Sequence, residues 1–180
     1  MKGIIFTEFL DMVEAKFSAD TVDGIIEQAN LPNGGAYTAV GTYPHEELVA
    51  MVVALSKDTN IATNTLVNVF GSHLFGRFFE RYPNFFEDVP TAFAFLATIE
   101  SIIHVEVKKL YPEAQLPRFV TEKHTEKELV LVYHSARHFG DLAAGLIQGC
   151  IDHFNEKITV QREDLPTEDG NANIRFSLSK

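Results

Sequence analysis

The hydrophobic pattern of this chain changes its period near Arg118, and this change limits the possible fold more than any other feature. Before Arg118, apolar residues recur at three- and four-residue steps, as in Phe6, Phe9 and Val13, which predicts one apolar side of a helix. After Arg118, short apolar runs appear, and residues 174–178 alternate strictly as a half-buried strand does. Helices followed by strands predict an α+β domain with a four-stranded antiparallel sheet.

Individual elements are placed by apolar stripes, prolines and glycines. Helices are expected to begin near Ile5 and near Pro44, and one should span residues 63–81 because Pro83 follows it. A longer helix is expected from near Pro90 to Tyr111. The other predicted elements are helices at 21–30 and 139–154, strands at 119–120, 129–133, 158–160 and 174–178, and a turn at 168–171.

The composition argues for a single domain, residues 1–180, and against several classes of partner. Apolar residues make up 46% of the chain, enough for one core, and the fifteen Phe residues supply large apolar rings. The net charge of −10 argues against nucleic-acid binding, which generally needs a basic surface. Because neither a signal peptide nor a long apolar stretch is evident, we expect a cytoplasmic protein without membrane insertion. Cys150, the only cysteine, is expected to be a buried packing residue.

Tyr133, Ser135 and Arg137 form the most informative polar group. They follow the apolar run 129–132, which is predicted to be a strand, and alternate residues of a strand share one face. Tyr133 and Ser135 should therefore point the same way, with Arg137 one step beyond. A phenol, a hydroxyl and a guanidinium together can hold carboxylates through charge-assisted hydrogen bonds. The alternative is an ordinary strand end, with Tyr133 in the core and Arg137 in solvent.

His104 lies in the long predicted helix, but beside its main apolar stripe rather than on it. Its helical neighbours on that side are Phe93 and Ala97. By periodicity alone His104 is a histidine on the flank of the helix, near solvent. A neutral imidazole on a rigid helix is also compatible with a haem-iron ligand, provided that it faces the haem rather than water.

Four separated segments together resemble the haem nitric oxide/oxygen-binding (H-NOX) family. The resemblance covers nearly the whole chain, and the segments occur in the order and at the spacing of the family. They are residues 1–6, 102–107 around His104, 116–118, and the motif formed by Tyr133, Ser135 and Arg137.

The resemblance implies a haem b (iron protoporphyrin IX) between a helical part, about residues 1–62, and a part with the sheet, about residues 63–180. His104 would be the proximal iron ligand, and Pro117 would press on the porphyrin and distort it. The residues that would bind the haem propionates are Tyr133, Ser135 and Arg137.

The same resemblance implies a distal wall formed by Ile5, Phe9, Phe78 and Leu142. Oxygen-binding members of the family carry a Tyr five residues after the motif arginine, where this chain has Leu142. Oxygen on ferrous haem draws negative charge and is held by hydrogen-bond donors, whereas NO binds tightly without them. We therefore expect binding of nitric oxide, and of carbon monoxide, but negligible binding of oxygen. The tyrosines that could in principle alter this are Tyr37, Tyr43 and Tyr82.

The family resemblance describes a sensor and not an enzyme. NO is expected to break the bond between iron and His104, to relieve the distortion imposed by Pro117 and to let the two halves rotate. Gly71 is the expected hinge, since glycine absorbs backbone changes, although close helix packing also explains a glycine there. Standalone members usually regulate a histidine kinase or a cyclic-di-GMP enzyme, so a partner in trans is expected.

Two other functions are alternatives to the sensor. A carrier of an apolar carboxylate would use the Phe-rich interior and hold its ligand with Tyr133, Ser135 and Arg137. A haem peroxidase-like enzyme would need a distal general acid–base, which the four distal residues do not offer. A metal site at His134, His138 and Asp141 would need helical geometry, yet this group spans a predicted strand-to-helix junction.

Overall fold

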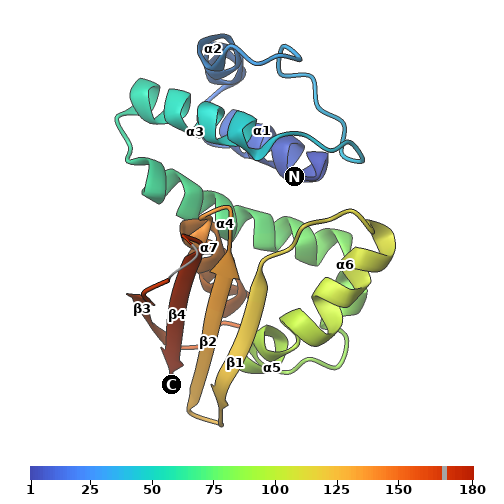
Figure 1. The fold of residues 1–180 in the computed structure, drawn as a ribbon, viewed down its shortest axis with the longest axis vertical. Coiled ribbons are helices and arrows are strands. Elements are labelled where there is room, and N and C mark those ends of the chain that lie inside the picture. The colour runs from blue at the N-terminus through green and yellow to red at the C-terminus, as the bar shows by residue number, and fades with distance from the viewer. Residues whose placement is uncertain (168–169) are drawn as a thin grey trace.

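Helices and a sheet occupy separate parts of the chain, as the change of hydrophobic period predicts. The computed structural model describes residues 1–167 and 170–180. Three helices pack together on one side of the long helix α4 (Thr63–Arg81), and the sheet lies on its other side (Figure 1). This arrangement confirms the predicted α+β class. The turn predicted at 168–171 includes residues 168 and 169, which lie outside the described part of the chain.

The first three helices enclose a core of aromatic and aliphatic side chains. The hydroxyl of Ser18 begins the second helix by accepting a hydrogen bond from the Thr21 amide at 3.1 Å. Phe6 and Phe9 are fully buried, so the apolar stripe read from the sequence is the inner side of the first helix. No described helix combines the length and the apolar character that crossing a membrane requires. The three helices are α1 (Gly3–Lys16), α2 (Ala19–Ala29) and α3 (His45–Thr59).

Helix α4 crosses helix α7 (Gly140–His153) with almost no space between the two backbones. A Cβ atom built on Gly145 would lie 2.0 Å from the carbonyl oxygen of Asn68. One built on Gly71 would lie 2.4 Å from the carbonyl oxygen of Leu142. Glycine is therefore needed at both positions, because any side chain would push the helices apart. Gly76, also on α4, has no atom within 4 Å of such a Cβ and has no packing role.

Helix α4 contributes to two hydrophobic cores. Phe70 and Leu74 pack with the first three helices, whereas Phe75 packs with α7 and the sheet. The division of the chain near residue 62 stays a prediction, because one long helix joins the two parts.

Four antiparallel strands form the sheet in the order β1-β2-β4-β3. One face of the two central strands is buried against α7, through Leu131 and Tyr133 on one strand and Phe176 on the other. Register places Tyr133 between Phe119 and Ile174. The strands are β1 (Arg118–His124), β2 (Glu128–Ser135), β3 (Thr159–Asp164) and β4 (Ala172–Ser179).

A π-helical turn interrupts the helix that was predicted from Pro90 to Tyr111. In this turn the Ile103 amide donates to the Thr98 carbonyl oxygen, five residues earlier, at 3.2 Å. Apolar spacing does not reveal such a turn, because one extra residue shifts the phase without disturbing the pattern on either side. The predicted helix is replaced by three segments, α5 (Ala92–Ala97), the π turn η2 (Ile99–Ile103) and α6 (His104–Leu110). A short 3-10 turn, η1 (Pro83–Phe86), precedes them.

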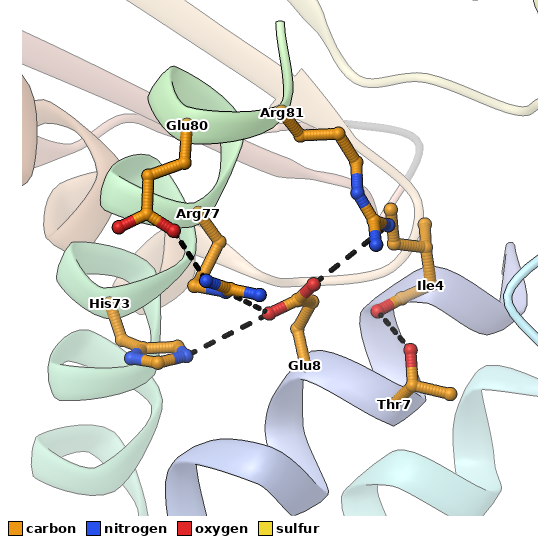
Figure 2. A network of polar contacts seen from close by, with 7 residues as sticks. All are labelled: Ile4, Thr7, Glu8, His73, Arg77, Glu80 and Arg81. Carbon is orange, nitrogen blue, oxygen red and sulfur yellow. Dashed lines mark hydrogen bonds and ion pairs between the residues drawn. The ribbon is translucent and has the colours of Figure 1, made fainter.

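A buried carboxylate connects α1 to α4 (Figure 2). Glu8 is only 3% exposed, and Arg77 Nε donates to its Oε2 at 2.8 Å. Arg81 and His73 each place a nitrogen 3.9 Å from the same carboxylate, and Arg77 also pairs with Glu80. The Glu8 carboxylate raises the pKa of Arg77, whereas burial lowers the pKa of His73. This cluster ties the helical group to α4 and was not anticipated from the sequence.

Candidate functional site

The described residues enclose a cavity of about 670 Å³ where α1, α4, α6, α7 and the sheet meet. This volume is in the range of pockets for small organic ligands and cofactors, roughly 300–1,000 Å³. The lining contributed by three of these helices is entirely apolar. The residues are Ile4 and Ile5 on α1, Leu74, Phe75 and Phe78 on α4, and Leu142, Ala143, Leu146 and Ile147 on α7.

His104 lies in the cavity lining, at the junction between η2 and α6. Residues five apart align in a π turn, and the His104 amide donates to the Ile99 carbonyl oxygen. Ile99 also lines the cavity, so the wide turn carries His104 onto the cavity side. A regular helix would have left it on the flank, as the sequence indicated.

The imidazole of His104 is largely buried, with 14% of the side chain exposed. Its Nδ1 lies 3.1 Å from Oε2 of Glu100, one helical turn earlier. Burial lowers the pKa of His104, and the Glu100 carboxylate opposes this effect only in part. The side chain is therefore neutral near pH 7, the form that has a nitrogen lone pair free to bind a metal.

Tyr133, Ser135 and Arg137 all line the cavity at the end of β2. Tyr133 is only 2% exposed, and burial raises the pKa of its phenol, which stays protonated and able to donate a hydrogen bond. The Ser135 hydroxyl accepts a hydrogen bond from the Arg137 amide at 3.2 Å, forming the turn that follows the strand. The structure thus gathers the three polar groups at one edge of an apolar cavity.

The guanidinium of Arg137 is held by the loop between α6 and β1. Nη2 donates to Oε1 of Gln115 at 2.7 Å, and Nη1 donates to the Gln115 carbonyl oxygen at 3.3 Å. Pro117 belongs to the same loop and also lines the cavity. The guanidinium of Arg137 therefore has protein partners, in contrast to the alternative prediction that it lies free in solvent.

Three of the four predicted distal residues line the cavity, namely Ile5, Phe78 and Leu142. Phe9 is not part of the lining. It lies in the core of the helical group, where its ring meets Phe70 edge to face at 5.3 Å. The apolar stripe of α1 continues from the cavity into that core, so spacing along the stripe does not separate a lining residue from a core residue.

The three candidate tyrosines have other partners. Tyr37 donates a hydrogen bond to Glu47 at 2.7 Å, and the Tyr43 hydroxyl accepts one from the Thr38 amide at 3.0 Å. Neither of these tyrosines is part of the cavity lining. Tyr82 does line the cavity, and burial together with the neighbouring Tyr111 raises its pKa.

The histidines near the strand end do not form a metal site. His134 is on β2, whereas His138 lies in the following turn with a φ of 54°, so the two do not share a helical face. Asp141 is paired with Arg162 at 2.6 Å. Among the described residues, no group of three metal-ligating side chains is close enough to hold an ion.

The residues around the cavity fit a haem. A neutral imidazole meets the need for an axial iron ligand, an apolar wall meets the need of the porphyrin, and the polar edge suits two carboxylates. Glu100 and Gln115, which hold His104 and Arg137, were missed from the sequence. The i−4 position of Glu100 relative to His104 was the one available signal, whereas a loop glutamine gives none.

Comparisons with known proteins cover nearly the whole chain. Residues 2–162 match the family model described as haem-NO-binding. Among solved structures, the Fe(II) unliganded H-NOX protein from K. algicida has a TM-score of 0.92 and 39% sequence identity, over 100% of this chain and 96% of that one. A search of curated protein sequences gave no significant match.

Two further H-NOX structures are similar over the full length. The protein from Shewanella woodyi, bound to IWP-051 in the Fe(II)CO state, has a TM-score of 0.83 and 36% identity, over 100% of this chain and 94% of that one. The protein from S. oneidensis in the Fe(II)NO state has a TM-score of 0.87 and 27% identity, over 100% of both chains. The chain therefore belongs to the haem-NO-binding (H-NOX) family of haem-based gas sensor domains.

Proposed function

We propose that this protein is a sensor of nitric oxide that binds haem b in the cavity, excludes oxygen and passes the signal to a separate effector protein. The observation that carries the proposal is the arrangement of the cavity lining, which combines a neutral His104, an edge that can bind carboxylates, and an apolar wall contributed by α1, α4 and α7. A haem bound there supplies a ferrous iron, to which diatomic gases can bind.

His104 is proposed to hold the haem through its Nε2 atom. Its neutral state follows from burial, and its Nδ1 atom is already occupied by Glu100, so the other nitrogen is the one left for iron. Both features support a role for His104 as an iron ligand.

Tyr133, Ser135 and Arg137 are proposed to bind the two propionates. The protonated phenol and the hydroxyl donate hydrogen bonds, and the guanidinium supplies the charge that two carboxylates require. Pro117, on the loop that also holds Arg137, is proposed to press against the porphyrin. The rigid pyrrolidine ring suits this role, since it cannot rotate away from a contact.

Selectivity for NO over oxygen is proposed to come from the apolar wall of α1, α4 and α7. Ile5, Phe78 and Leu142 provide no hydrogen-bond donor, and bound oxygen needs one. Phe9 would act from behind this wall rather than on it, because it packs in the helical core. Tyr82 is the one candidate phenol in the lining, and its interaction with Tyr111 supports a structural role for it.

Transmission of the signal is proposed to run through α4, which belongs to both hydrophobic cores. Gly71 is proposed as the hinge about which the two parts rotate, because it lies in α4, the helix that belongs to both cores, at the point where α4 touches the α7 backbone. The proposed effector is a histidine kinase or a cyclic-di-GMP enzyme in trans. This part of the proposal rests on family membership.

Titration of the haem-free protein with haem separates this proposal from the carrier of an apolar carboxylate. We expect one haem per chain, with a Soret band that is altered or lost in the His104→Ala variant and unaffected by excess fatty acid. The carrier predicts that fatty acid binds first and displaces haem, and that His104→Ala changes nothing.

A further inference from the structure

A single carboxylate oxygen connects His104 to the sheet. Oε2 of Glu100 accepts a hydrogen bond from Nδ1 of His104 at 3.1 Å and another from the Phe119 amide at 3.0 Å. Glu100 belongs to the π turn η2, and Phe119 is the second residue of β1. The same oxygen thus contacts the candidate iron ligand and the backbone of a different element.

This connection is supported by a ring contact on the same residues. The Phe119 ring lies 6.1 Å from the His104 ring and 5.4 Å from the Tyr133 ring, centroid to centroid. Phe119 and Tyr133 are also direct partners in the β1–β2 register. The imidazole is therefore fixed by a hydrogen bond on one nitrogen and by an aromatic neighbour anchored to the sheet.

We propose that Glu100 is a positioning residue that orients the His104 imidazole and strengthens its bond to the haem iron. This inference rests on the proposed role of His104 as iron ligand. A carboxylate that accepts the Nδ1 proton fixes the tautomer and leaves the lone pair on Nε2. Its negative charge also makes the imidazole a stronger electron donor toward a metal.

The Phe119 amide sets the direction of this carboxylate. A glutamate on a helix surface has several rotamers, and a second donor on the neighbouring strand selects the one that meets His104. About half of the Glu100 side chain, 48%, stays exposed, so water screens part of its charge. We therefore expect a moderate change in the iron bond when the charge is removed, and no loss of the fold.

In the alternative interpretation, Glu100 and His104 are simply an i, i+4 pair on a helix surface. That interpretation predicts a small effect on helix stability and none on the iron. Glu106 provides a matched control, because it lies two residues after His104, carries the same charge and pairs with Lys109 instead.

The test compares the haem-loaded, reduced protein with its Glu100→Gln and Glu106→Gln variants by resonance Raman spectroscopy. We expect the iron–histidine stretching band to move to lower frequency in Glu100→Gln and to stay in place in Glu106→Gln. After addition of NO, a larger share of Glu100→Gln should have lost the histidine bond. Identical spectra for all three proteins would overturn the inference.

A second measurement replaces the His104 side chain by a free ligand, so that its affinity for the haem iron can be measured directly. In the His104→Gly variant, added imidazole can occupy the vacated space, and 1-methylimidazole can serve as a probe whose substituted nitrogen has no proton to donate. We expect Glu100→Gln to weaken imidazole binding about 10-fold, the lower end of the effect of losing a partner of a metal ligand, and to leave 1-methylimidazole unchanged. Equal affinities for imidazole with and without Glu100→Gln would also overturn the inference.

These outcomes are distinct from a failure of the proposed function. If the wild-type chain takes up no haem, or if haem binds without His104, the proposed function fails before Glu100 is considered. If haem binds through His104 and Glu100→Gln has no effect, the proposed function stands and the role of Glu100 is rejected.

Discussion

Adding a side chain where α4 and α7 touch should destabilise the protein by an amount that follows from the distances at this contact. Gly145→Ala places a Cβ atom 2.0 Å from the Asn68 carbonyl oxygen, whereas ordinary contacts begin at 3.4 Å. Both groups belong to helix backbones, so neither can swing aside, and the helices must separate by at least the missing 1.4 Å (3.4 − 2.0). Such overpacking costs about 3 kcal/mol, the upper end of the usual range.

Gly76→Ala on α4 is the matched control. Alanine favours a helix interior over glycine by about 1 kcal/mol, and this gain applies to both substitutions. Gly76 has open space around it, so we expect Gly76→Ala to raise the free energy of unfolding by about 1 kcal/mol. Gly145→Ala should lower it by about 2 kcal/mol, which is the gain of 1 minus the clash of 3.

Urea denaturation of the haem-free proteins, followed by circular dichroism, measures both values. Leu142 and Leu146 lie on the same helix as Gly145 and line the cavity, so haem binding should also weaken in Gly145→Ala but not in Gly76→Ala. If the two substitutions stabilise the protein equally, the helices do not touch at Gly145 and the packing argument fails.

Other predictions concern the buried cluster and the cavity. Glu8→Gln should lower the free energy of unfolding by about 1.5–3 kcal/mol, the usual contribution of a hydrogen bond to a charged group. The exposed Glu80→Gln should have little effect in the same urea assay. Burial holds the pKa of His73 below its usual value of 6.5, so the unfolded chain binds a proton at this histidine more readily than the folded chain, and the free energy of unfolding falls as the pH drops below about 6.5. His73→Gln should reduce this pH dependence in stability measurements made between about pH 5 and 8. Leu142→Tyr should introduce a hydrogen-bond donor, so that the visible spectrum of the reduced protein in air differs from that of the unliganded protein. Tyr82→Phe should leave the spectrum in air unchanged, and the opposite pattern for the two variants would make Tyr82 the distal donor.

Much of the fold was predictable because strong local signals agree. Pro83 follows the last turn of α4 and marks its end, and the observed helix, Thr63–Arg81, has the predicted bounds. Strands β2 and β4 were predicted from their apolar residues, although each strand extends beyond its apolar run at both ends. The π turn before His104 was not predictable, since it is a change of hydrogen bonding that alters no residue pattern.

The candidate site was predictable only in part, for a related reason. Strand alternation predicts Tyr133 and Ser135 on one face from local geometry alone, and both line the cavity. The contacts of Arg137 with Gln115, and of Glu100 with Phe119, join segments whose separation in space depends on the whole fold. The packing of Phe9 in the core is likewise decided by where the cavity ends, which no periodicity encodes.

The proposed function requires that the cavity bind haem through His104 and admit NO but not oxygen. The most direct test is the visible absorption spectrum of the purified, anaerobically reduced, haem-loaded protein, recorded alone, with NO and then with air in place of NO. We expect a Soret band that shifts with NO, and no oxygen-bound species in air. A stable, distinct spectrum in air would contradict the proposed exclusion of oxygen. Failure to form any Soret band after haem addition would rule out haem binding and, with it, the proposed function.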